Sequence, residues 1–341
     1  MHVGILGAGN ISRTHAMAAR AIPGVRVVAV HGDNREKARA LAREYGAAAY
    51  DDLDAFLDSR PLDVVLIGSP SGRHAEQAIA AVRRGLHVLV EKPLDVTVER
   101  VDALLTEADR AAVKVGVFFQ DRMKPGIRRL KRLVNDGDLG RPILAAGRVR
   151  WHRPPEYYAD SRWRGIWSLD GGGAVMNQAI HTVDLMAWLL GKVVGVQART
   201  ATAFHAIEVE DTAVAIFEFA SGALATLEAS TAAFPGYPRR LDLTGTEGTV
   251  LLEHDRIVAA DLRTPRPDLV GADAGDANAS ASSPLVSDAS GHQAILEDFL
   301  QAVKTGGTPA CDGREGRRSV ELVQALYEAA NTGAAVRPAT G

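Results

Sequence analysis

The stretch HVGILGAGNIS, residues 2–12, decides how the N-terminal part of the chain folds. Residues 2–6 are mostly apolar, which is typical of a short buried strand. The glycine-rich GAGNIS that follows, residues 7–12, predicts a tight turn that opens a helix. Strand, turn and helix in this order form the first half of a βαβ unit.

Further short segments rich in β-branched residues follow, and helical patterns separate them. The predicted strands are residues 25–30, 63–68, 87–91 and 113–119, and the helices between them include 35–44, 74–84 and 97–111. Such alternation predicts a parallel sheet with helices on both faces. In sheets of this kind ligands bind at the carboxyl ends of the strands.

The turn at residues 7–12 matches G-x-G-x-x-(G/A), except that Ser12 stands at the third small position. Glycines let the backbone approach a pyrophosphate, and a helix N-terminus supplies N–H donors and a positive dipole end. We therefore interpret the turn as a dinucleotide site rather than as a purely structural turn. The cofactor contacts predicted here are Gly7, Gly9, Asn10 and Ile11.

The end of the second strand bears on which dinucleotide binds. An acid there bonds the ribose hydroxyls, whereas an arginine accommodates a 2′-phosphate. Asp33 is the candidate acid, with Asn34 and Arg35 beside it. NAD is favoured and NADP stays open, and Asp33 has the alternative role of capping the next helix.

The turn SPSGRHA, residues 69–75, follows the third strand of the predicted sheet. Ser69 and Pro70 fall where the carboxyl end of that strand would meet the cofactor. His74 is a further candidate contact, with a capping or surface histidine as the alternative.

The tripeptide EKP, residues 91–93, ends the next strand, and we count Glu91 and Lys92 among the cofactor contacts. Proline restricts the residue before it to extended geometry, which fixes the direction of Lys92. A lysine amine there can donate to a substrate oxygen and stabilise developing negative charge. A solvated surface lysine is the alternative.

After Phe119 the pattern changes to a helix at residues 125–140 and short strands joined by turns. These strands are residues 142–153, 193–202, 212–219, 223–230, 240–244 and 248–252. Their spacing indicates an antiparallel sheet, and an open sheet needs its second face covered, so we expect a homodimer or homotetramer. Residues 265–291 predict a long exposed loop.

The stretch GGGAVMNQAIHTVDLMAWLLG, residues 171–191, predicts a mostly apolar helix opened by three glycines. One stripe at helical spacing carries Asn177, His181, Asp184 and Trp188. The glycines would let the backbone come close to cofactor or substrate. On spacing alone, a satisfied core histidine is the alternative for His181, and Asp184 could set its tautomer or form a buried bond.

Residues 154–170, PPEYYADSRWRGIWSLD, are rich in aromatic and arginine residues, although only 5% of the chain is aromatic. Aromatic faces stack on sugar rings, and arginine binds hydroxyl or acidic groups. A loop anchored by buried aromatics is the alternative. The substrate contacts predicted from this stretch and from FFQDRMKP, residues 118–125, are Tyr157, Tyr158, Trp163, Arg164 and Arg122.

Length, charge and cysteine content exclude several classes of protein. The 341 residues suggest two domains, and the net charge of −3 does not indicate a general nucleic-acid or membrane-surface binder. The single cysteine, Cys311, excludes an internal disulfide, and no metal site is expected. We expect neither a signal peptide nor a membrane span, and a cytoplasmic location.

GAGNIS, SPSGRHA, EKP and GGGAVMNQAIHTVDLM occur in this order and at similar separations in the Gfo/Idh/MocA oxidoreductases, which the chain resembles nearly from end to end. The resemblance implies a Rossmann dinucleotide-binding domain at residues 1–120. It also implies an α/β domain at residues 121–341 with a large, mostly antiparallel open sheet, and a site between the domains. Lys92 matches the lysine of the family's EKP motif and His181 its catalytic histidine.

Asn177 departs from the family's pattern, because many members have aspartate four residues before the histidine. Asparagine can hold a hydroxyl, but it cannot take up a proton or provide a charge. Lys92 and His181 must then carry more of the proton transfer, and Asn177 is left to position the histidine or a hydroxyl.

The implied activity is hydride transfer between NAD, or NADP, and a secondary alcohol or ketone of a small-molecule substrate. That substrate would be a cyclitol, a sugar or a sugar derivative, and the arginines hint at a uronate or a nucleotide sugar. Two alternatives stay open. One is an NAD-dependent glycosidase that oxidises its sugar transiently, and the other is a non-catalytic sensor that binds dinucleotide.

Overall fold

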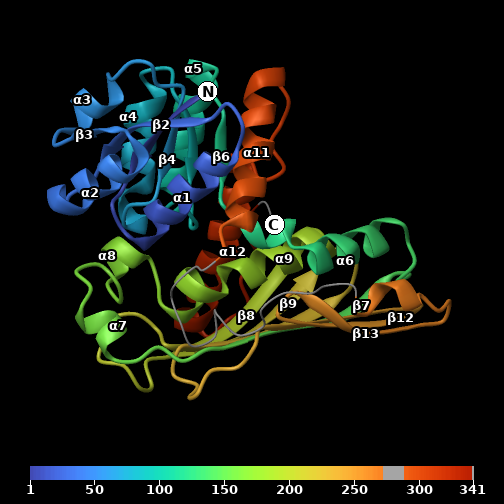
Figure 1. Cartoon of the computed structure of the whole chain (residues 1–341). Coiled ribbons are helices and arrows are strands. Elements are labelled where there is room, and N and C mark those ends of the chain that lie inside the picture. The colour runs from blue at the N-terminus through green and yellow to red at the C-terminus, as the bar shows by residue number, and fades with distance from the viewer. Residues whose placement is uncertain (272–287, 340–341) are drawn as a thin grey trace. The chain divides into compact units, whose positions relative to one another are not determined.

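The computed structural model describes residues 1–271 and 288–339, which divide into two compact units (Figure 1). Of the described residues, 1–120 and 288–317 form the first unit, and 121–271 and 318–339 form the second. The sequence predicted one continuous domain over 121–341. In the structure the segment 288–317 packs instead with the N-terminal unit.

The first unit is a parallel sheet whose strands follow the order β3-β2-β1-β4-β5-β6 within the described residues. Their bounds are β1 (His2–Leu6), β2 (Arg26–His31), β3 (Ala48–Tyr50), β4 (Val64–Ile67), β5 (His87–Val90) and β6 (Val115–Val117). This is the strand order of a doubly wound dinucleotide-binding sheet, with its switch point between β1 and β4. The Rossmann fold expected from the sequence is confirmed.

Helices cover this sheet, and one of them comes from the far end of the chain. They are α1 (Asn10–Ala21), α2 (Arg35–Tyr45), α3 (Leu53–Leu57), α4 (His74–Val82), α5 (Val98–Ala111) and α11 (Ser290–Thr305), with a 3₁₀ turn η1 (Ser71–Arg73). In Figure 1 the orange α11 lies with the blue and green elements of the first unit, and it packs against α1 and β5.

The second unit is built on a sheet with the order β13-β12-β11-β7-β10-β9-β8 among the described residues. Its strands are β7 (Pro142–Arg150), β8 (Val193–Ala201), β9 (Thr212–Phe219), β10 (Leu224–Ser230), β11 (Arg240–Gly245), β12 (Gly248–Glu253) and β13 (Arg256–Leu262). Only the pairing of β7 with β10 is parallel in this part of the structure. The mostly antiparallel sheet predicted for this unit is therefore confirmed.

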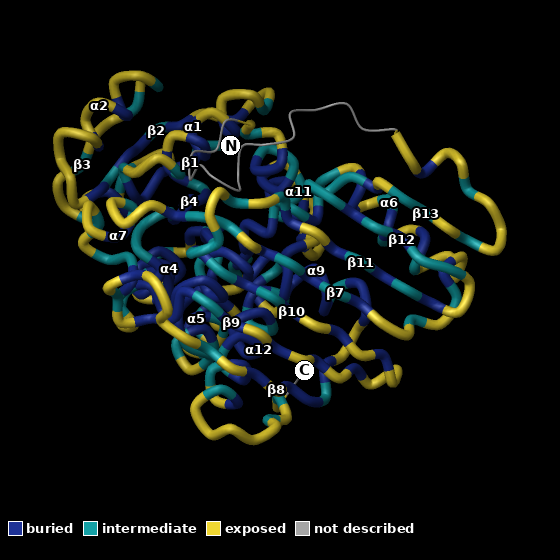
Figure 2. The backbone as a smooth tube through the Cα atoms, turned by 90° about the horizontal axis from the view of Figure 1, so that it is seen from below, coloured by how far each residue is buried: buried dark blue, intermediate teal, exposed yellow. Residues whose placement is uncertain are grey.

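The second unit also contains helices, several of which contact its sheet. They include α6 (Pro125–Asn135), α7 (Glu156–Ala159), α8 (Trp167–Asp170), η3 (Ala174–Ala179) and α9 (Ile180–Leu190), with 3₁₀ turns η2 (Gln120–Met123) and η4 (Pro267–Leu269). The boundary at Arg317 falls within α12 (Gly313–Thr332). Helix α9, which contacts β7, is buried along almost its whole length (Figure 2).

One face of this sheet is exposed and carries both apolar and charged side chains. Along β9, Ala213, Ala215 and Phe217 are buried, whereas Val214 and Ile216 between them are 52% and 42% exposed. Alternation of this kind places one set of side chains in the core and the other set on the outer face. The outer face of β9 therefore carries exposed apolar side chains, while the same face of β7, β10, β11 and β12 carries ion pairs such as Arg150–Glu228 and Arg240–Glu253.

The structure bears on the long loop and on the membrane span considered in the sequence. Of the loop predicted over residues 265–291, residues 272–287 lie outside the described residues, while Pro267–Leu269 form a 3₁₀ turn and α11 begins at Ser290. No helix in the described part of the chain is both long enough and apolar enough to cross a membrane.

A buried carboxylate joins three elements of the first unit. Glu91 Oε1, just after β5, lies 2.9 Å from His15 Nε2 of α1 and 3.3 Å from His292 Nε2 of α11. Burial raises the pKa of Glu91, but the hydrogen bonds from both histidines outweigh it and hold the pKa well below its usual value. The three side chains could also hold a metal ion, but the shorter distance is that of a hydrogen bond, which needs no ion.

We predict that Glu91→Gln lowers the free energy of unfolding by about 3 kcal/mol at neutral pH, because it removes the charged acceptor of hydrogen bonds from two buried histidines. The unfolded carboxyl takes up a proton near pH 4.5, while the folded one does so only at lower pH. The wild-type advantage should therefore be complete above about pH 4.5 and shrink as pH falls below it. Urea unfolding across this range measures it.

Glu44→Gln is the control, since Glu44 pairs with Arg13 on the surface. Its effect should be much smaller at every pH, because exposed ion pairs contribute little. An equal loss for both variants, or a loss for Glu91→Gln that does not depend on pH, would contradict the assignment.

Candidate functional site

The glycine-rich turn has the geometry that a pyrophosphate requires. Gly7 has a φ of +126°, and a Cβ there would lie 2.7 Å from the carbonyl oxygen of Gly68. Helix α1 begins at Asn10, and its N-cap residue, Gly9, makes no side-chain cap bond. The first turn of α1 contains no acidic residue. The N–H groups that open this helix therefore suit an anionic ligand, and the turn fits NAD.

The acid at the end of β2 is exposed and paired. The Asp33 side chain is 72% exposed, and its Oδ2 accepts a hydrogen bond of 2.7 Å from Arg73 Nη1. It does not cap α2: Asn34 does, through a bond of 3.0 Å from the Lys37 N–H. The alternative role considered for Asp33 is thus filled by its neighbour. Arg35 is exposed and lies 3.9 Å from Asp51.

The turns after β4 and β5 are tied to each other. The His74 ring nitrogens lie 2.8 Å from the Pro93 carbonyl oxygen and 2.9 Å from that of Ser69. Ser69 Oγ in turn donates to Gln77 Oε1 at 2.5 Å. His74 is only 1% exposed and joins the two loops, so it is not the surface histidine considered as an alternative, and its role as a cofactor contact stays a prediction. Pro70 precedes η1 as its N-cap.

Lys92 follows the buried Glu91 at the carboxyl end of β5. Its backbone N–H donates to Glu91 Oε2 at 3.2 Å, and its peptide bond to Pro93 is cis. The Glu91 carboxylate faces His15 and His292, so it holds the turn and is not available to a cofactor, contrary to the prediction for this residue. Lys92 is half-buried.

In the second unit, the glycines before the histidine helix approach protein rather than ligand. A Cβ at Gly173 would lie 1.8 Å from the Glu210 carbonyl oxygen. The Glu210 carboxylate accepts bonds from the N–H groups of Gly173 (2.9 Å) and Val175 (2.8 Å) and from Tyr327 Oη (2.9 Å). Burial raises the pKa of Glu210 to about 7 against these bonds, which lower it. These contacts give Gly173 a structural reason to be glycine, and close approach of a ligand to this turn stays a prediction.

Within the predicted helix, Ala174–Ala179 form a π-helix before α9 begins at Ile180. Such turns are rare and are frequent at functional sites. Asn177 lies on this turn, and its Nδ2 donates to Asp170 Oδ1 at 2.5 Å. Its Oδ1 accepts from Gln178 Nε2 at 3.0 Å. The asparagine side chain is therefore held in place by the buried carboxylate of Asp170.

His181 is 7% exposed near the start of α9, and a carboxylate that the sequence did not suggest lies beside it. His181 Nδ1 is 3.6 Å from Asp121 Oδ2, and the same oxygen accepts a hydrogen bond of 2.6 Å from Arg239 Nη1. Burial raises the pKa of Asp121, but Arg239 and His181 outweigh it and keep the pKa below its usual range. Asp121 is therefore ionised.

Arg122 and Asp184 form a buried ion pair with each other. Arg122 Nε and Nη2 donate to the two oxygens of Asp184 at 2.7 and 2.5 Å, and Ser319 Oγ lies 3.1 Å from Oδ1. Both side chains are at most 3% exposed. Arg122 is thus used inside the fold, not as the substrate contact that we expected, and Asp184 forms the buried bond rather than setting the tautomer of His181.

The predicted aromatic and arginine residues divide into a buried and a half-buried group. Tyr158 is 8% exposed, and its hydroxyl donates to Thr231 Oγ1 at 3.0 Å, so it anchors the loop. The Arg164 guanidinium lies over the rings of Tyr157 (4.3 Å) and Trp163 (5.0 Å). Gln178 Nε2 donates to Tyr157 Oη at 3.1 Å, which links this stack to the residue beside Asn177.

Arg164 also lines a pocket of about 720 Å³, whose walls are Pro155, Tyr158, Ala159, Gly165, Ile166, Phe204, His205, Ala206, Ile207 and Glu208. No carboxylate among the described residues forms an ion pair with Arg164, whose Nε is buried without a hydrogen-bond partner in that part of the chain. Arginines without a carboxylate partner are suited to binding carboxylate or phosphate groups.

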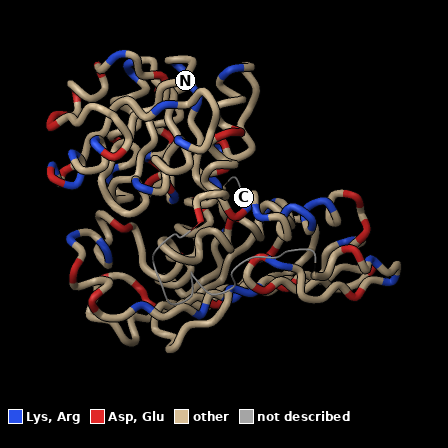
Figure 3. Tube along the Cα trace, viewed as in Figure 1, with Lys and Arg blue, Asp and Glu red and all other residues tan. Residues whose placement is uncertain are grey.

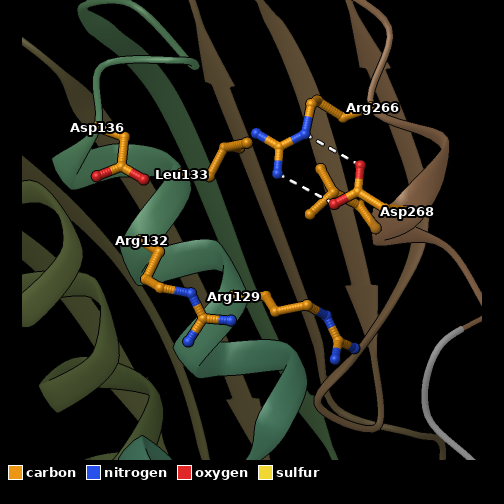
Figure 4. A pocket seen from close by; sticks show the side chains of 7 residues that line it. Arg129, Arg132, Leu133, Asp136, Arg266 and Asp268 are labelled. Carbon is orange, nitrogen blue, oxygen red and sulfur yellow. Dashed lines mark hydrogen bonds and ion pairs between the residues drawn. The ribbon is translucent and has the colours of Figure 1, made fainter.

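A second, smaller pocket of about 80 Å³ lies on α6, where Figure 3 shows a concentration of basic residues. It is lined by Arg129, Arg132, Leu133, Asp136, Arg266, Asp268 and Leu269 (Figure 4). Arg266 pairs there with Asp268, so part of its positive charge is already neutralised. None of the predicted site residues lines this pocket.

A doubly wound sheet with an uncapped glycine-rich turn, in one chain with an open antiparallel sheet and a buried histidine helix, defines a dinucleotide-dependent oxidoreductase. The chain belongs to the Gfo/Idh/MocA oxidoreductase family. The family model for the NAD-binding Rossmann fold matches residues 1–119, and the model for the C-terminal domain matches residues 127–251. The cofactor of this fold is NAD.

Several relatives match nearly the whole chain. The WlbA dehydrogenase from Bordetella pertussis, solved in complex with NADH and UDP-GlcNAcA, is 31% identical, with a TM-score of 0.89 and 98% of each chain covered. Myo-inositol 2-dehydrogenase of Thermotoga maritima is 26% identical over 94% of each chain. D-apiose dehydrogenase of Paraburkholderia graminis is 27% identical over 97% of this chain and 88% of its own.

We predict that Asp33→Asn weakens NAD binding about tenfold, because a neutral amide accepts ribose hydroxyls less strongly than a carboxylate does. Fluorescence titration with NADH measures the affinity, and the melting temperature should not change.

Asp51→Asn is the matched control, since Asp51 is also exposed and paired with an arginine, Arg39. Equal affinities for wild type and Asp33→Asn would show that Asp33 does not contact the ribose.

Proposed function

We propose that the protein is an NAD-dependent dehydrogenase or reductase that acts on a secondary alcohol, or the matching ketone, of a carbohydrate or cyclitol. The observation that carries this proposal is the pairing in one chain of the EKP lysine, Lys92, with a buried histidine, His181, on the helix after the glycines. The relatives named dehydrogenases of inositol and apiose support the substrate class.

In this proposal His181 is the general base. A neutral imidazole accepts the proton of the substrate hydroxyl near neutral pH, where its ordinary pKa makes it effective. Lys92 donates a hydrogen bond to the same oxygen and stabilises its developing charge. NAD, when bound, supplies the hydride acceptor for the carbinol carbon.

Asn177 positions a hydroxyl of the substrate or the histidine itself, and it does not exchange protons. Its amide is already oriented by Asp170 and Gln178, so it can present a fixed donor and acceptor. A fixed amide distinguishes hydroxyl geometries at low entropic cost, which suits the recognition of a sugar or cyclitol.

The proposed substrate is a carboxylated or phosphorylated sugar, such as a uronate or a nucleotide sugar. Arg164 supports this choice, because it lines the 720 Å³ pocket and has no carboxylate partner among the described residues. The WlbA structure, which contains UDP-GlcNAcA, supports it as well. NADP stays a second cofactor to test, because Arg73 lies beside Asp33.

We also propose that the chain forms a homodimer or homotetramer through the outer face of the second unit's sheet. Val214 and Ile216 support it, since apolar side chains half exposed on a flat sheet are stabilised when a second copy covers them. Light scattering measures the oligomeric state.

We predict that Lys92→Ala and His181→Ala each keep NADH affinity and reduce kcat at least about a hundredfold, since each removes a group that acts on the reacting oxygen. The assay follows nicotinamide absorbance with uronates, nucleotide sugars, neutral sugars and cyclitols, and with both cofactors. Normal turnover in either variant would refute the assigned roles. Product formation without net change in NADH would indicate a glycosidase instead.

Arg164→Met should raise KM for acidic sugars about tenfold or more and leave KM for neutral sugars unchanged, because a charge-assisted bidentate contact is lost. Arg162→Met, two residues earlier and exposed, is the control. Equal effects on acidic and neutral sugars would exclude Arg164 as the group that binds the anion.

A further inference from the structure

We propose that Asp121 is a positioning residue for His181. In this proposal it supplies the negative charge that residue 177, as an asparagine, cannot provide. The inference rests on the proposed function, in which His181 accepts the hydroxyl proton. Asp121 precedes α6 on the turn η2, so the charge comes from a different element than the family's aspartate would.

The geometry places this charge on one side of the imidazole. Asp121 Oδ2 lies 3.6 Å from His181 Nδ1, which is longer than a hydrogen bond, so the carboxylate acts on the ring through its charge. Because Nδ1 faces the carboxylate, Nε2 is the atom that we assign as proton acceptor. A negative charge at this distance stabilises the imidazolium that forms when the hydroxyl O–H bond breaks. The C–H electron pair leaves the same carbinol carbon as hydride to NAD.

The two acids closest to His181 in the sequence of its own helix region are committed elsewhere. Asp184 is bound by Arg122 through two hydrogen bonds. Asp170 accepts from Asn177 and from the backbone N–H of Gly165. The Asp121 oxygen, in contrast, lies within ion-pair distance of the imidazole.

Arg239 keeps Asp121 ionised and in place. It is 8% exposed, and it donates from Nη1 to Asp121 and from Nη2 to Asp255, on the turn between β12 and β13. A buried carboxylate needs such a partner to remain charged. Because the guanidinium of Arg239 is shared between two acids, it neutralises only part of the Asp121 charge, and the remainder acts on His181.

The titratable and charged groups packed around this arrangement come from the N-cap of α6, from α9, from the residue before β11 and from the β12–β13 turn. They are Lys124, His181, Asp184, Arg239, His254 and Asp255. Among them Lys124 lowers the pKa of Asp121, and Asp255 offsets the charge of Arg239. Replacing Asp121 by a neutral residue therefore removes the acid that lies between Arg239 and His181 and that screens the positive charge of Arg239.

The first test is Asp121→Asn. We expect the pKa of His181 to fall by about one unit, since a stabilising negative charge is lost and a positive one is unscreened. In alcohol oxidation the ascending limb of kcat against pH should move down by the same amount, and the plateau kcat should fall about tenfold or more. NADH affinity should stay as in the wild type.

Asp121→Glu and Asp255→Asn complete the set. The glutamate keeps the charge and should restore most of the pH limb, which a merely structural role for Asp121 would not require. Asp255→Asn alters the same arginine without removing the acid beside His181, so it should move the limb by less than half as much.

The pKa of His181 is also measured directly by histidine NMR, with the His181→Ala spectrum giving the assignment. This readout needs no turnover, so it separates the inference from the proposed function. An Asp121→Asn protein that melts normally but whose His181 titrates as in the wild type would overturn the inference. Should Asp121→Asn fail to fold, an Asp121→Glu protein that folds but whose pH limb and NMR titration both move down by a full unit would overturn it equally, because the charge beside His181 is kept in that variant.

Discussion

A carboxylate that is removed from water must be paired with hydrogen-bond donors or with a cation. Such buried carboxylates contact the residues, or the turns, to which the proposed chemistry is assigned. Glu91 holds the turn that carries Lys92. Asp170 orients Asn177, and Asp121 lies beside His181. Since a buried acid tolerates few alternative arrangements of its donors, each of these turns is fixed more tightly than apolar packing alone would fix it.

The helices and strands were largely predictable, because the spacing of apolar residues that identifies them involves only residues close together in the sequence. The strands of the first unit and most of those in the second lie within a few residues of their predicted bounds. Strands β3 and β13 were missed, since the first has only three residues and the second is half exposed with weak alternation. The membership of α11 in the first unit depends on contacts distant in sequence, which periodicity does not reveal.

The sequence predicted which residue types occur at the candidate site, but it predicted few of the hydrogen-bond and ion-pair partners of these residues. A helical stripe grouped Asn177 with His181 and Asp184, but the π-turn and the ion pair with Arg122 gave those side chains separate surroundings. Asp121 stands next to Arg122 in FFQDRMKP, residues 118–125, from which the sequence predicts only the arginine as a site residue. Its contact with His181 spans about sixty residues of sequence, so no spacing rule could indicate it.

The chain enters the first unit twice, and this has a consequence for how the protein can be divided. A gene fragment that stops after β6 would encode the whole parallel sheet and both ends of its glycine-rich turn. It would lack α11, and with it His292, one of the two imidazoles that hold the Glu91 charge. A dinucleotide-binding unit that is to be combined with another substrate domain therefore consists of two separate segments of the chain. Such a domain exchange must transfer α11 together with the parallel sheet.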